Sequence, residues 1–367
     1  MPGKRKTGYW TTGLACLCIV SCIMCIMLCG LLAGCGEETG GAETQEPVSR
    51  DFFAMDTYMT VTAYGDQAEQ ATEAAEEEVY RLDAMLSAGS ADSEIGRLNA
   101  DGSGTLSEET AGLVKRGLEF YDATEHRFDI AIYPVMEAWG FTDKNYRVPS
   151  KDELESLLAL TDADEVSLDE KTGKVAFGKD HMAIDLGGIA KGYTSSRIVE
   201  IYREMGVTSG LVNLGGNVQV LGTKPDGSKW RVAIQDPKSA SGGDENAQET
   251  QYMGVLEAED VAAITSGAYE RNFTKGGRFY HHIIDPATGE PADSGLQSVT
   301  IVSNDGTLAD ALSTSLFIMG KEQAIQYWRA HSDEFGCILL DEDDELFVSE
   351  NIADSFHSDN YPVTVFE

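Results

Sequence analysis

The chain has 367 residues, with 27 Lys and Arg against 62 Asp and Glu, and a formal net charge of −35. A charge of this sign repels nucleic-acid phosphates, so nucleic acid is excluded as a partner. An anionic small ligand would meet the same repulsion, and a bound divalent cation is the simplest way to offset it locally.

The N-terminus predicts an exported protein. Lys4-Arg5-Lys6 precedes an apolar run that ends in Leu32-Ala33-Gly34-Cys35, as is typical of a secretion signal. Cys35 in this context resembles the acylation site of a bacterial lipoprotein. We therefore expect residues 1–35 to be a lipoprotein signal peptide, and the rest of the chain to lie outside the cytoplasm, anchored to the membrane through lipid on Cys35. The alternative is an uncleaved anchor, since the apolar run is nearly long enough to span a bilayer.

Cysteine usage predicts a domain without disulfides. Six of the seven cysteines lie in the first 35 residues, and Cys337 is the only one after them. One thiol cannot form an internal disulfide, and no Cys-x-x-Cys pair outside the signal could bind zinc. Cys337 lies in an apolar run over residues 335–340, where a buried strand residue is expected rather than a nucleophile.

After the signal, residues 36–50 are polar and Gly-rich, and we expect a flexible tether. The folded domain is expected over residues 51–350, followed by a C-terminal extension over 351–367. Apolar residues at helical spacing predict helices over 67–87, 108–122, 151–160, 189–205, 307–319 and 321–331. Alternating or continuous apolar runs predict strands over 58–64, 174–177, 181–185, 210–221, 230–234, 253–266, 279–284, 296–303 and 336–348. Residues 238–252 contain few apolar side chains and are expected to form a surface loop.

The predicted strands and helices cluster along the chain and do not alternate strictly. This order favours an α+β fold over a doubly wound α/β fold. The roughly 330 residues after the signal are enough for one large domain or two fused halves.

Two Gly-Gly motifs could bring backbone groups close to a ligand. Residues 183–193 (Ala-Ile-Asp-Leu-Gly-Gly-Ile-Ala-Lys-Gly-Tyr) predict a short strand that ends at Asp185 and turns through two glycines into a helix, whose N-terminus favours anions. The spacing is neither a P-loop nor Gly-x-Gly-x-x-Gly, and a tight turn without a ligand is an equal alternative. Residues 211–218 (Leu-Val-Asn-Leu-Gly-Gly-Asn-Val) predict a β-bulge or a close backbone approach, and the residues alone do not decide between them.

A third motif combines residues 265–272 (Thr-Ser-Gly-Ala-Tyr-Glu-Arg-Asn) with residues 281–289 (His-His-Ile-Ile-Asp-Pro-Ala-Thr-Gly). The Asp-Pro-x-Thr-Gly run predicts a turn, because Pro fixes φ and Gly supplies the permissive position. His281 and His282 follow each other on a strand, so at most one of them can enter a given site. His282 is the candidate for a functional role, and a structural histidine is the alternative.

A fourth motif, residues 306–314 (Gly-Thr-Leu-Ala-Asp-Ala-Leu-Ser-Thr), begins a predicted helix. Asp310 and Thr314 are four residues apart and share one helix face. A carboxylate and a hydroxyl side by side suit a hard cation such as Mg²⁺, which prefers oxygen ligands. The alternative is that Asp310 and Thr307 only cap the helix.

Together and in this order, the motifs resemble the ApbE family of FAD:protein FMN transferases. Residues 55–57 (Met-Asp-Thr), 92–99 (Asp-Ser-Glu-Ile-Gly-Arg-Leu-Asn), 128–129 (Phe-Asp) and 139–141 (Trp-Gly-Phe) add to the resemblance, which covers nearly all of residues 51–350. It implies an α+β fold related to the tunnelling fold, with FAD in a cleft between two halves.

The resemblance also implies roles for single residues. FAD contacts are implied for Met55, Arg127, Phe128, Asp129, Asp185, Lys191 and Ile284. Mg²⁺ ligands are implied for the backbone oxygen of Gly188 and for Asp310, Ser313 and Thr314. The implied catalytic residues are Asp310 and His282, the latter for proton transfer or phosphate contact.

The chain departs from the family pattern at two places. Residues 86–90 (Leu-Ser-Ala-Gly-Ser) lack the aromatic residue that many members carry after Leu-Ser. Residues 129–135 (Asp-Ile-Ala-Ile-Tyr-Pro-Val) stand where the family usually has Asp-Pro-Thr-Val-Gly-Pro-Leu. Contacts to the flavin or the adenine are expected to differ at both places.

The implied activity is Mg²⁺-dependent transfer of FMN from FAD to a Thr or Ser hydroxyl of an acceptor protein, with release of AMP. The acceptor is expected to carry the signature Asp-x-x-Ser/Thr-Gly-Ala-Thr/Ser and to be a membrane electron-transfer subunit. The nearest run in this chain has Tyr269 at the acceptor position, so the chain is the modifier and not its own substrate. Two alternatives are an Mg²⁺-dependent FAD pyrophosphatase and a flavin-binding lipoprotein without catalysis. Retention of Asp310, Thr314 and His282 favours catalysis, since storage needs no metal.

Overall fold

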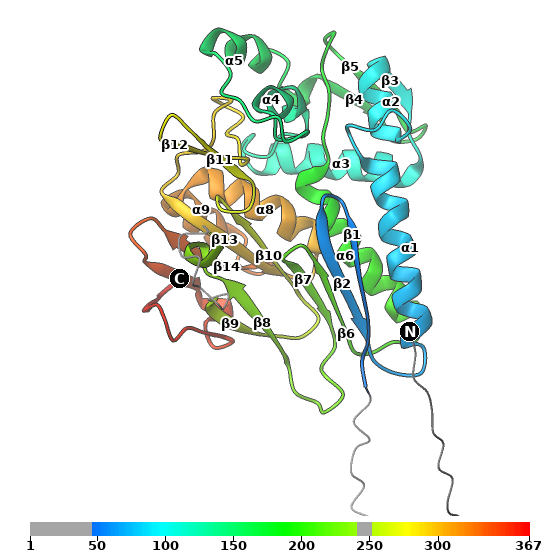
Figure 1. Ribbon diagram of the computed structural model, residues 1–367, viewed down its shortest axis with the longest axis vertical. Coiled ribbons are helices and arrows are strands. Elements are labelled where there is room, and N and C mark those ends of the chain that lie inside the picture. The colour runs from blue at the N-terminus through cyan, green and yellow to red at the C-terminus, as the bar shows by residue number, and fades with distance from the viewer. Residues whose placement is uncertain (1–45, 241–251) are drawn as a thin grey trace, which may run out of the picture. The chain divides into compact units, whose positions relative to one another are not determined.

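The computed structural model describes residues 46–240 and 252–367 (Figure 1). The expected signal peptide, Cys35, most of the expected tether and most of the expected loop over 238–252 lie outside the described residues. Within the described part of the chain, no helix is both long and apolar enough to cross a bilayer.

The helices and strands follow each other in a mixed order. The helices are α1 (Ala68–Leu86), α2 (Glu94–Asp101), α3 (Glu108–Ala123), α4 (Tyr133–Trp139), α5 (Lys151–Leu158), α6 (Gly187–Glu204), α7 (Pro237–Ala240), α8 (Gly306–Met319), α9 (Lys321–Ala330) and α10 (Glu350–Ala353), with 3₁₀ turns η1 (Ile130–Ile132) and η2 (Ala163–Glu165). The strands are β1 (Val48–Ala54), β2 (Thr57–Ala63), β3 (Ser103–Thr105), β4 (Val166–Asp169), β5 (Lys174–Phe177), β6 (Gly210–Leu214), β7 (Asn217–Leu221), β8 (Trp230–Gln235), β9 (Tyr252–Ala258), β10 (Ala262–Gly267), β11 (Asn272–Lys275), β12 (Arg278–His281), β13 (Leu296–Ser303), β14 (Gly336–Asp341), β15 (Leu346–Ser349), β16 (Phe356–His357) and β17 (Val363–Phe366).

A nine-stranded sheet forms the centre of the domain, in the order β1-β2-β6-β7-β10-β13-β14-β15-β17. Its neighbouring strands run antiparallel, except that β15 and β17 run parallel. Strand β14 is buried along its whole length and β13 along nearly all of it, so the middle of the sheet is covered on both faces. Cys337 lies on β14 with no exposed surface, which confirms the expected core cysteine.

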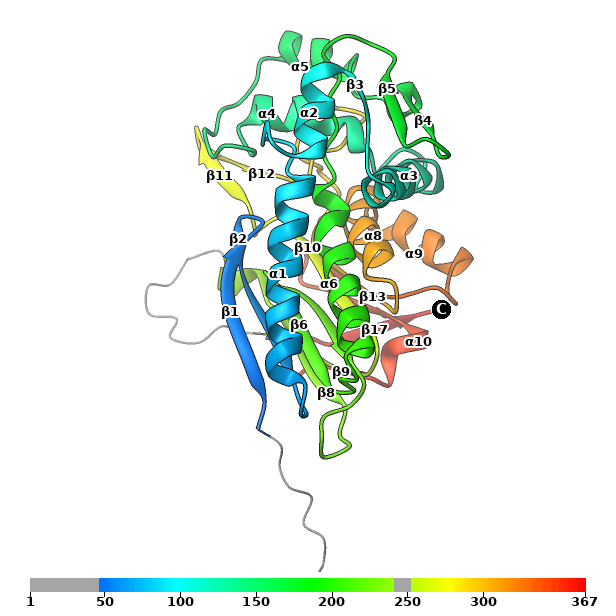
Figure 2. The same cartoon turned by 90° about the vertical axis from the view of Figure 1, so that its right-hand side faces the viewer.

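Helices cover one face of the sheet and a small sheet covers the other. Helix α1 packs on β1 and β2, α6 on β6 and β7, α8 on β10 and β13, and α9 on β14. Figure 2 shows α1, α6 and α8 side by side on this face. The three-stranded sheet β16-β9-β8 packs its apolar side chains, including Trp230 and Leu256, against Val220 and Ile338 of the large sheet. Segregated helices on a mostly antiparallel sheet confirm the α+β expectation.

A further part of the domain carries α2 to α5 and the short sheet β3-β5-β4, at the top of Figure 1. Its apolar core includes Phe128, Ile130 and Ile184, and it joins the main part through Ile189 of α6 and Ala311 of α8. Helices α6 and α8 therefore belong to both parts, and side chains on their shared face can meet residues from either part.

The strand predicted over residues 181–185 does not form. The backbone N–H of Ile184 instead donates to Oδ1 of Asn99 at 2.8 Å, and its carbonyl accepts from Nδ2 of Asn99 at 2.9 Å. The N–H of Asp185 donates to the carbonyl of Ile130 at 2.7 Å. A side-chain amide thus replaces the partner strand, which the apolar pattern of the segment alone could not reveal.

The Gly-Gly pair inside the strand predicted over 210–221 is a hairpin turn and not a bulge. Gly215 and Gly216 have φ values of 68° and 100° and connect β6 to β7. Two-residue hairpin loops favour residues that tolerate positive φ. Gly215 has no room for a side chain, because a Cβ there would lie 2.3 Å from Oγ1 of Thr57.

Both ends of the described chain are more ordered than the sequence suggests. Strand β1 begins at Val48, three residues before the expected start of the domain, and pairs with β2 along its whole length. In the expected C-terminal extension, β16 pairs with β9 and β17 pairs with β15. Residues 351–367 thus complete two sheets of the domain.

Helices α6 and α8 cross at two glycines. A Cβ atom at Gly192 would lie 2.1 Å from the backbone oxygen of Gly306, and one at Gly306 would lie 2.6 Å from the backbone oxygen of Gly192. The helices can therefore approach this closely only without side chains at the crossing. The crossing brings the N–H of Gly192 to within 2.8 Å of Oδ2 of Asp310.

Gly192→Ala is expected to destabilise the domain by roughly 1–3 kcal/mol, as overpacking of a tight contact usually does. Gly112→Ala is the matched control, because Gly112 lies in α3 and an added Cβ there meets no atom within 4 Å. Alanine at position 112 should stabilise the helix by about 0.5–1 kcal/mol. Thermal unfolding should thus give a lower Tm for Gly192→Ala and an equal or higher Tm for Gly112→Ala. Equal losses in both variants would contradict the close crossing.

Candidate active site

A cavity of about 540 Å³ lies where the two parts of the domain meet, a size typical of small-molecule sites. It is lined by segments that are far apart in the sequence. These segments contribute Asp56, Thr57, Arg127, Phe128, Asp129, Ile132, Met136, Asp185, Gly187, Gly188, Lys191, Gly215, Gln235, Thr265, Ser266, Tyr269, Glu270, Arg271, His282, Ile283, Ile284, Pro286, Asp310, Thr314 and Ile318.

Most of the site residues predicted from the sequence line this one cavity. They are Arg127, Phe128, Asp129, Asp185, Gly188, Lys191, His282, Ile284, Asp310 and Thr314. Met55 and Ser313 do not line it, but each adjoins a residue that does. Met55 precedes Asp56 in the turn between β1 and β2, and Oγ of buried Ser313 lies 2.8 Å from Oγ of Ser266.

The turn into α6 forms one wall of the cavity. Helix α6 begins at Gly187, whose N–H donates to Oδ1 of Asp185 at 3.0 Å. A Cβ at Gly188 would lie 2.8 Å from the ring of Phe128, so a glycine allows this ring to pack against the first turn of the helix. The second glycine is thus needed for packing. At the start of the helix, the N–H groups of Ile189 and Ala190 donate to the carbonyl of Leu186, at 2.9 Å each.

Asp310 and Thr314 share one face of α8, as their spacing predicts, and Asp310 does not cap the helix. The N-cap is Asp305, whose Oδ1 accepts from the N–H groups of Thr307 and Leu308. Asp310 is buried, and its carboxylate accepts from the N–H of Gly192 at 2.8 Å and from Nδ2 of Asn217 at 3.2 Å. Burial raises the pKa of Asp310, which these two bonds and the charge of Lys191 partly oppose.

His281 and His282 enter different hollows, as expected for neighbours at the end of a strand. The ring of His281 lies outside the cavity, with Nε2 3.1 Å from the carbonyl of Ala292. His282 lines the cavity, and its Nδ1 is buried without a hydrogen-bond partner among the described residues. Burial, and then the charges of Arg271 and Lys191, lower the pKa of His282 to about 3, so its imidazole is neutral.

Lys191 is the cation that acts on most of the ionisable groups in the cavity. Its charge opposes the rise in the pKa of Asp185, Glu270 and Asp310 that burial causes. Glu270 is reached by water, yet the cavity walls displace enough bulk solvent to raise its pKa to about 7. Lys191 thus acts on all three acids, and Arg271 acts on Asp185 and Glu270 as well. An anionic ligand would need these two cations or added positive charge.

Several lining residues were not assigned a role from the sequence. Tyr269, Glu270 and Arg271 belong to the motif over 265–272, so their place beside His282 could have been found from it. Ile132 and Met136, on η1 and α4, and Gln235, at the end of β8, gave no such signal. Their position depends on how the two parts of the domain meet.

The two departures from the family pattern meet in space. A Cβ at Gly89 would lie 3.5 Å from the hydroxyl of Tyr133. Tyr133 is buried at the start of α4, and burial raises the pKa of its hydroxyl to about 12. Tyr133, which stands where the expected family pattern has Gly, therefore lies beside Gly89, near which the expected family pattern has an aromatic residue.

The residues around Asp310 fit a hard cation. Within residues 46–240 and 252–367, no ion pair neutralises the buried Asp310 carboxylate. In the same residues, no three His, Cys, Asp or Glu side chains converge as a metal site, so a cation here would depend on other oxygen ligands besides Asp310. The neighbouring donors are hydroxyl oxygens, since Oγ1 of Thr314 lies 3.1 Å from Oγ of Ser266. One carboxylate with hydroxyl and carbonyl oxygens suits Mg²⁺, which usually takes its remaining ligands from water and substrate phosphates.

Comparison with known proteins gives the family. The model of the ApbE family matches residues 55–339. The chain belongs to the ApbE family. A protein of Treponema pallidum named FAD:protein FMN transferase is 32% identical over 344 residues, covering 88% of this chain and 88% of the relative. A protein of the same name from Klebsiella pneumoniae is 35% identical over 224 residues, covering 61% of this chain and 64% of the relative.

Solved structures of ApbE proteins have the same fold. The ApbE protein of Thermotoga maritima superposes with a TM-score of 0.77 at 31% identity, covering 84% of this chain and 99% of that protein. The flavin transferase ApbE of Vibrio cholerae superposes with a TM-score of 0.74, covering 85% of this chain and 99% of that protein. At 24% identity, the second likeness supports the ApbE fold alone.

Proposed function

We propose that this protein transfers FMN from FAD to a Thr or Ser hydroxyl of an acceptor protein in an Mg²⁺-dependent reaction that releases AMP. The observation that carries the proposal is that Asp310 and Thr314 of α8 line the same cavity as Lys191 of α6 and His282. Relatives named FAD:protein FMN transferase support the same reaction.

The chain supplies several groups that attract the diphosphate of FAD. Lys191 and Arg271 line the cavity and offer positive charge to a diphosphate. Phe128 and Met136 give the cavity apolar walls for the rings of the ligand. These groups would bind the diphosphate of FAD in the cavity that Asp310 and Thr314 of α8 also line.

Asp310, Ser313 and Thr314 would hold Mg²⁺, together with the backbone oxygen of Gly188. When bound, Mg²⁺ neutralises phosphate charge that builds up during transfer. In an otherwise acidic cavity this role is needed, since Asp185, Glu270 and Asp310 would repel the ligand.

In the reaction, the acceptor hydroxyl oxygen forms a bond to the phosphorus on the FMN side. The bond between this phosphorus and the bridging oxygen breaks, and AMP leaves with the electron pair. The hydroxyl proton must leave as the bond forms, and neutral His282 can accept it at a ring nitrogen. Burial is the main cause of the low pKa of His282, and the charges of Arg271 and Lys191 add to it. A bound diphosphate would offset the part that comes from these two charges.

Product analysis distinguishes this proposal from its two alternatives. The protein is incubated with FAD and Mg²⁺, with and without an acceptor that carries the signature, and AMP and free FMN are separated by chromatography. The transferase releases AMP with little free FMN when the acceptor is present. A pyrophosphatase releases both in equal amounts whatever the acceptor, and a flavin-binding protein releases neither.

We also propose that the protein is an extracytoplasmic lipoprotein anchored through Cys35, and that its acceptor is a membrane electron-transfer subunit. The basic, apolar and small-residue order of residues 1–35 supports the anchor. An anchored enzyme reaches acceptors on the same membrane surface more readily than a diffusing one.

Cys35→Ser should abolish lipid attachment and signal cleavage, because the thiol is the acylated group. Cys29→Ser in the same apolar run is the matched control and should leave both unchanged. Incorporation of a labelled fatty acid and the intact mass of the expressed protein measure the two events. A wild-type protein that keeps residues 1–35 and carries no lipid would support the uncleaved anchor instead.

A further inference from the structure

A groove adjoins the active-site cavity. One hollow of about 370 Å³ shares Tyr269 with the cavity, and a second of about 470 Å³ shares Arg278, Pro291, Ala292 and Asp293 with the first. The two hollows thus form one continuous depression beside strand β12, which we call the hairpin groove. It begins at Tyr269 and extends to α5, whose residues line its far end.

Tyr269 separates the groove from the cavity. Its side chain lines both, and a Cβ at Gly267 would lie 2.2 Å from its ring, so the ring packs over the backbone at the end of β10. Nδ2 of Asn272 donates to the carbonyl of Tyr269 at 2.8 Å and holds the turn. A molecule in the groove is therefore separated from the cavity by one side chain at this point.

The floor of the groove is fixed by hydrogen bonds. The N–H of Ala292 donates to the carbonyl of Ile283 at 2.9 Å, and the carbonyl of Ala292 lies 3.1 Å from Nε2 of His281. The backbone of Ala292 is thus held at both its N–H and its C=O, against the segment of the chain that contains His281 and Ile283. A preformed floor of this kind binds a partner at a lower entropic cost than a loose loop.

The groove combines an exposed aromatic ring with uncompensated negative charge. Phe279 of β12 leaves 48% of its surface exposed at the groove. Arg278 pairs with Glu290 at 3.6 Å, whereas Asp293 and Glu342 have no ion-pair partner within the described ranges 46–240 and 252–367. An occupant that offers an apolar side chain and a cationic side chain would match both features.

We propose that the hairpin groove binds the segment of the acceptor protein that carries the reactive hydroxyl, with a Lys or Arg of that segment beside Asp293 and Glu342. This inference rests on the proposed function. With FAD in the cavity, the acceptor must reach the reacting phosphorus from outside, and the groove adjoins the cavity at Tyr269. An extended segment suits a long, narrow depression, since it advances about 3.3 Å per residue and presents side chains to both walls.

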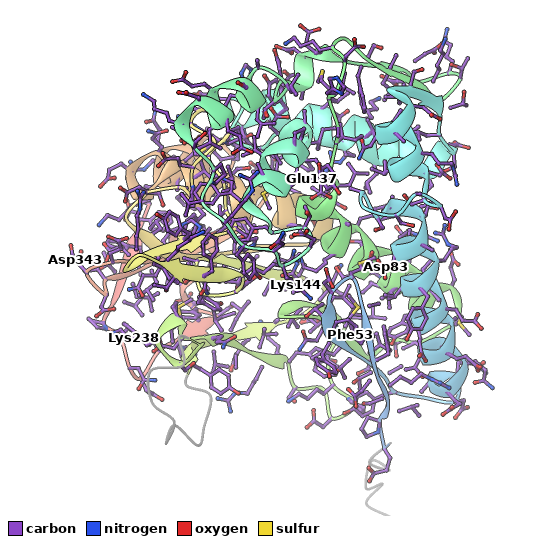
Figure 3. The ribbon with its side chains drawn as sticks, turned by 45° about the horizontal axis from the view of Figure 1, so that its top comes forward. Phe53, Asp83, Glu137, Lys144, Lys238 and Asp343 are labelled. Carbon is purple, nitrogen blue, oxygen red and sulfur yellow. The ribbon has the colours of Figure 1, made fainter. Side chains whose placement is uncertain are left out.

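A second pair of exposed aromatic side chains lies on β1 and β2, beside the turn whose Asp56 and Thr57 line the cavity. Phe53 and Tyr58 face each other across β1 and β2 with ring centroids 5.3 Å apart, and Tyr58 is 81% exposed. Figure 3 shows Phe53 well separated from Lys238 and Asp343, which are sequence neighbours of the groove residues Pro237 and Glu342. Tyr58→Ala is therefore a matched control for the loss of an exposed ring near the active site.

The test compares Phe279→Ala, the double variant Asp293→Lys/Glu342→Lys, and Tyr58→Ala in the full chain. Steady-state FMN transfer gives KM for the acceptor protein, and flavin fluorescence gives the affinity for FAD. Each groove variant should raise KM for the acceptor about tenfold, as expected when an interface anchor is removed, with kcat and FAD affinity within about twofold of wild type. Tyr58→Ala should change none of the three.

Two results would overturn the docking inference while leaving the function intact. One is an unchanged acceptor KM in both groove variants, and the other is a larger rise in KM for Tyr58→Ala than for Phe279→Ala. If the wild-type protein binds FAD but never modifies an acceptor, the proposed function fails, and the inference fails with it.

Discussion

Asp310→Ala is expected to lower the rate of FMN transfer by about 10³-fold, within the range seen when a group that stabilises developing phosphate charge is removed. The carboxylate is buried, accepts two neutral hydrogen bonds and lies on the face of α8 that lines the cavity. Its removal takes away the one carboxylate among the expected Mg²⁺ ligands. Transfer is measured as AMP release at saturating FAD and acceptor, over a range of Mg²⁺ concentrations.

Asp305→Ala on the same helix is the control for Asp310→Ala. Asp305 caps α8 by accepting from the N–H groups of Thr307 and Leu308, and it does not line the cavity. Its loss should cost about 1 kcal/mol of stability and leave transfer nearly unchanged. If Asp310→Ala retains more than a tenth of the wild-type rate while it is folded, Asp310 is not a ligand for the essential cation.

Lys191→Met should weaken FAD binding by roughly 10- to 100-fold, because it leaves Asp185, Glu270 and Asp310 around an anionic ligand without their shared cation. The same change removes one of the charges that, besides burial, lower the pKa of His282, so this pKa should rise. FAD affinity is measured by flavin fluorescence with a chelator present. The pKa of His282 is measured by NMR titration of the imidazole.

Lys144→Met is the control for Lys191→Met, because Lys144 does not line the cavity but pairs with Asp56, which does. Nζ of Lys144 lies 3.4 Å from Oδ1 of Asp56 in an exposed pair, and exposed pairs contribute little. This variant should change FAD affinity by less than about threefold and leave the pKa of His282 in place. If the two lysine variants lose affinity equally, the general charge of the protein decides binding and not the position of Lys191.

Most of the candidate site could be predicted because its residues lie in short motifs whose local geometry is strongly constrained. The turn from Asp185 into α6, the shared face of Asp310 and Thr314, and the separation of His281 from His282 follow from φ preferences and from helix and strand periods. All of these except His281 line the cavity, as expected. The α+β class likewise follows from the clustering of strands and helices.

The rest depends on contacts between distant segments, which periodicity does not encode. Ile184 has its backbone bonds satisfied by the side chain of Asn99, so an apolar run that looks like a strand forms none. Residues 363–366 gain strand structure only because β15 offers them an edge. The groove beyond Tyr269 arises from β12, the segment over 291–293 and α5 together, and no single motif announces it.

The intact mass of an acceptor protein tests the central claim most directly. The protein is incubated with FAD, Mg²⁺ and an acceptor that carries the signature, beside parallel reactions with Asp310→Ala or with a chelator. The account predicts that the acceptor gains the mass of one FMN bound as a phosphoester, that the gain is lost when the signature hydroxyl is removed, and that it is absent in both parallel reactions. An acceptor of unchanged mass beside metal-dependent release of FMN and AMP would contradict the transferase and identify a pyrophosphatase.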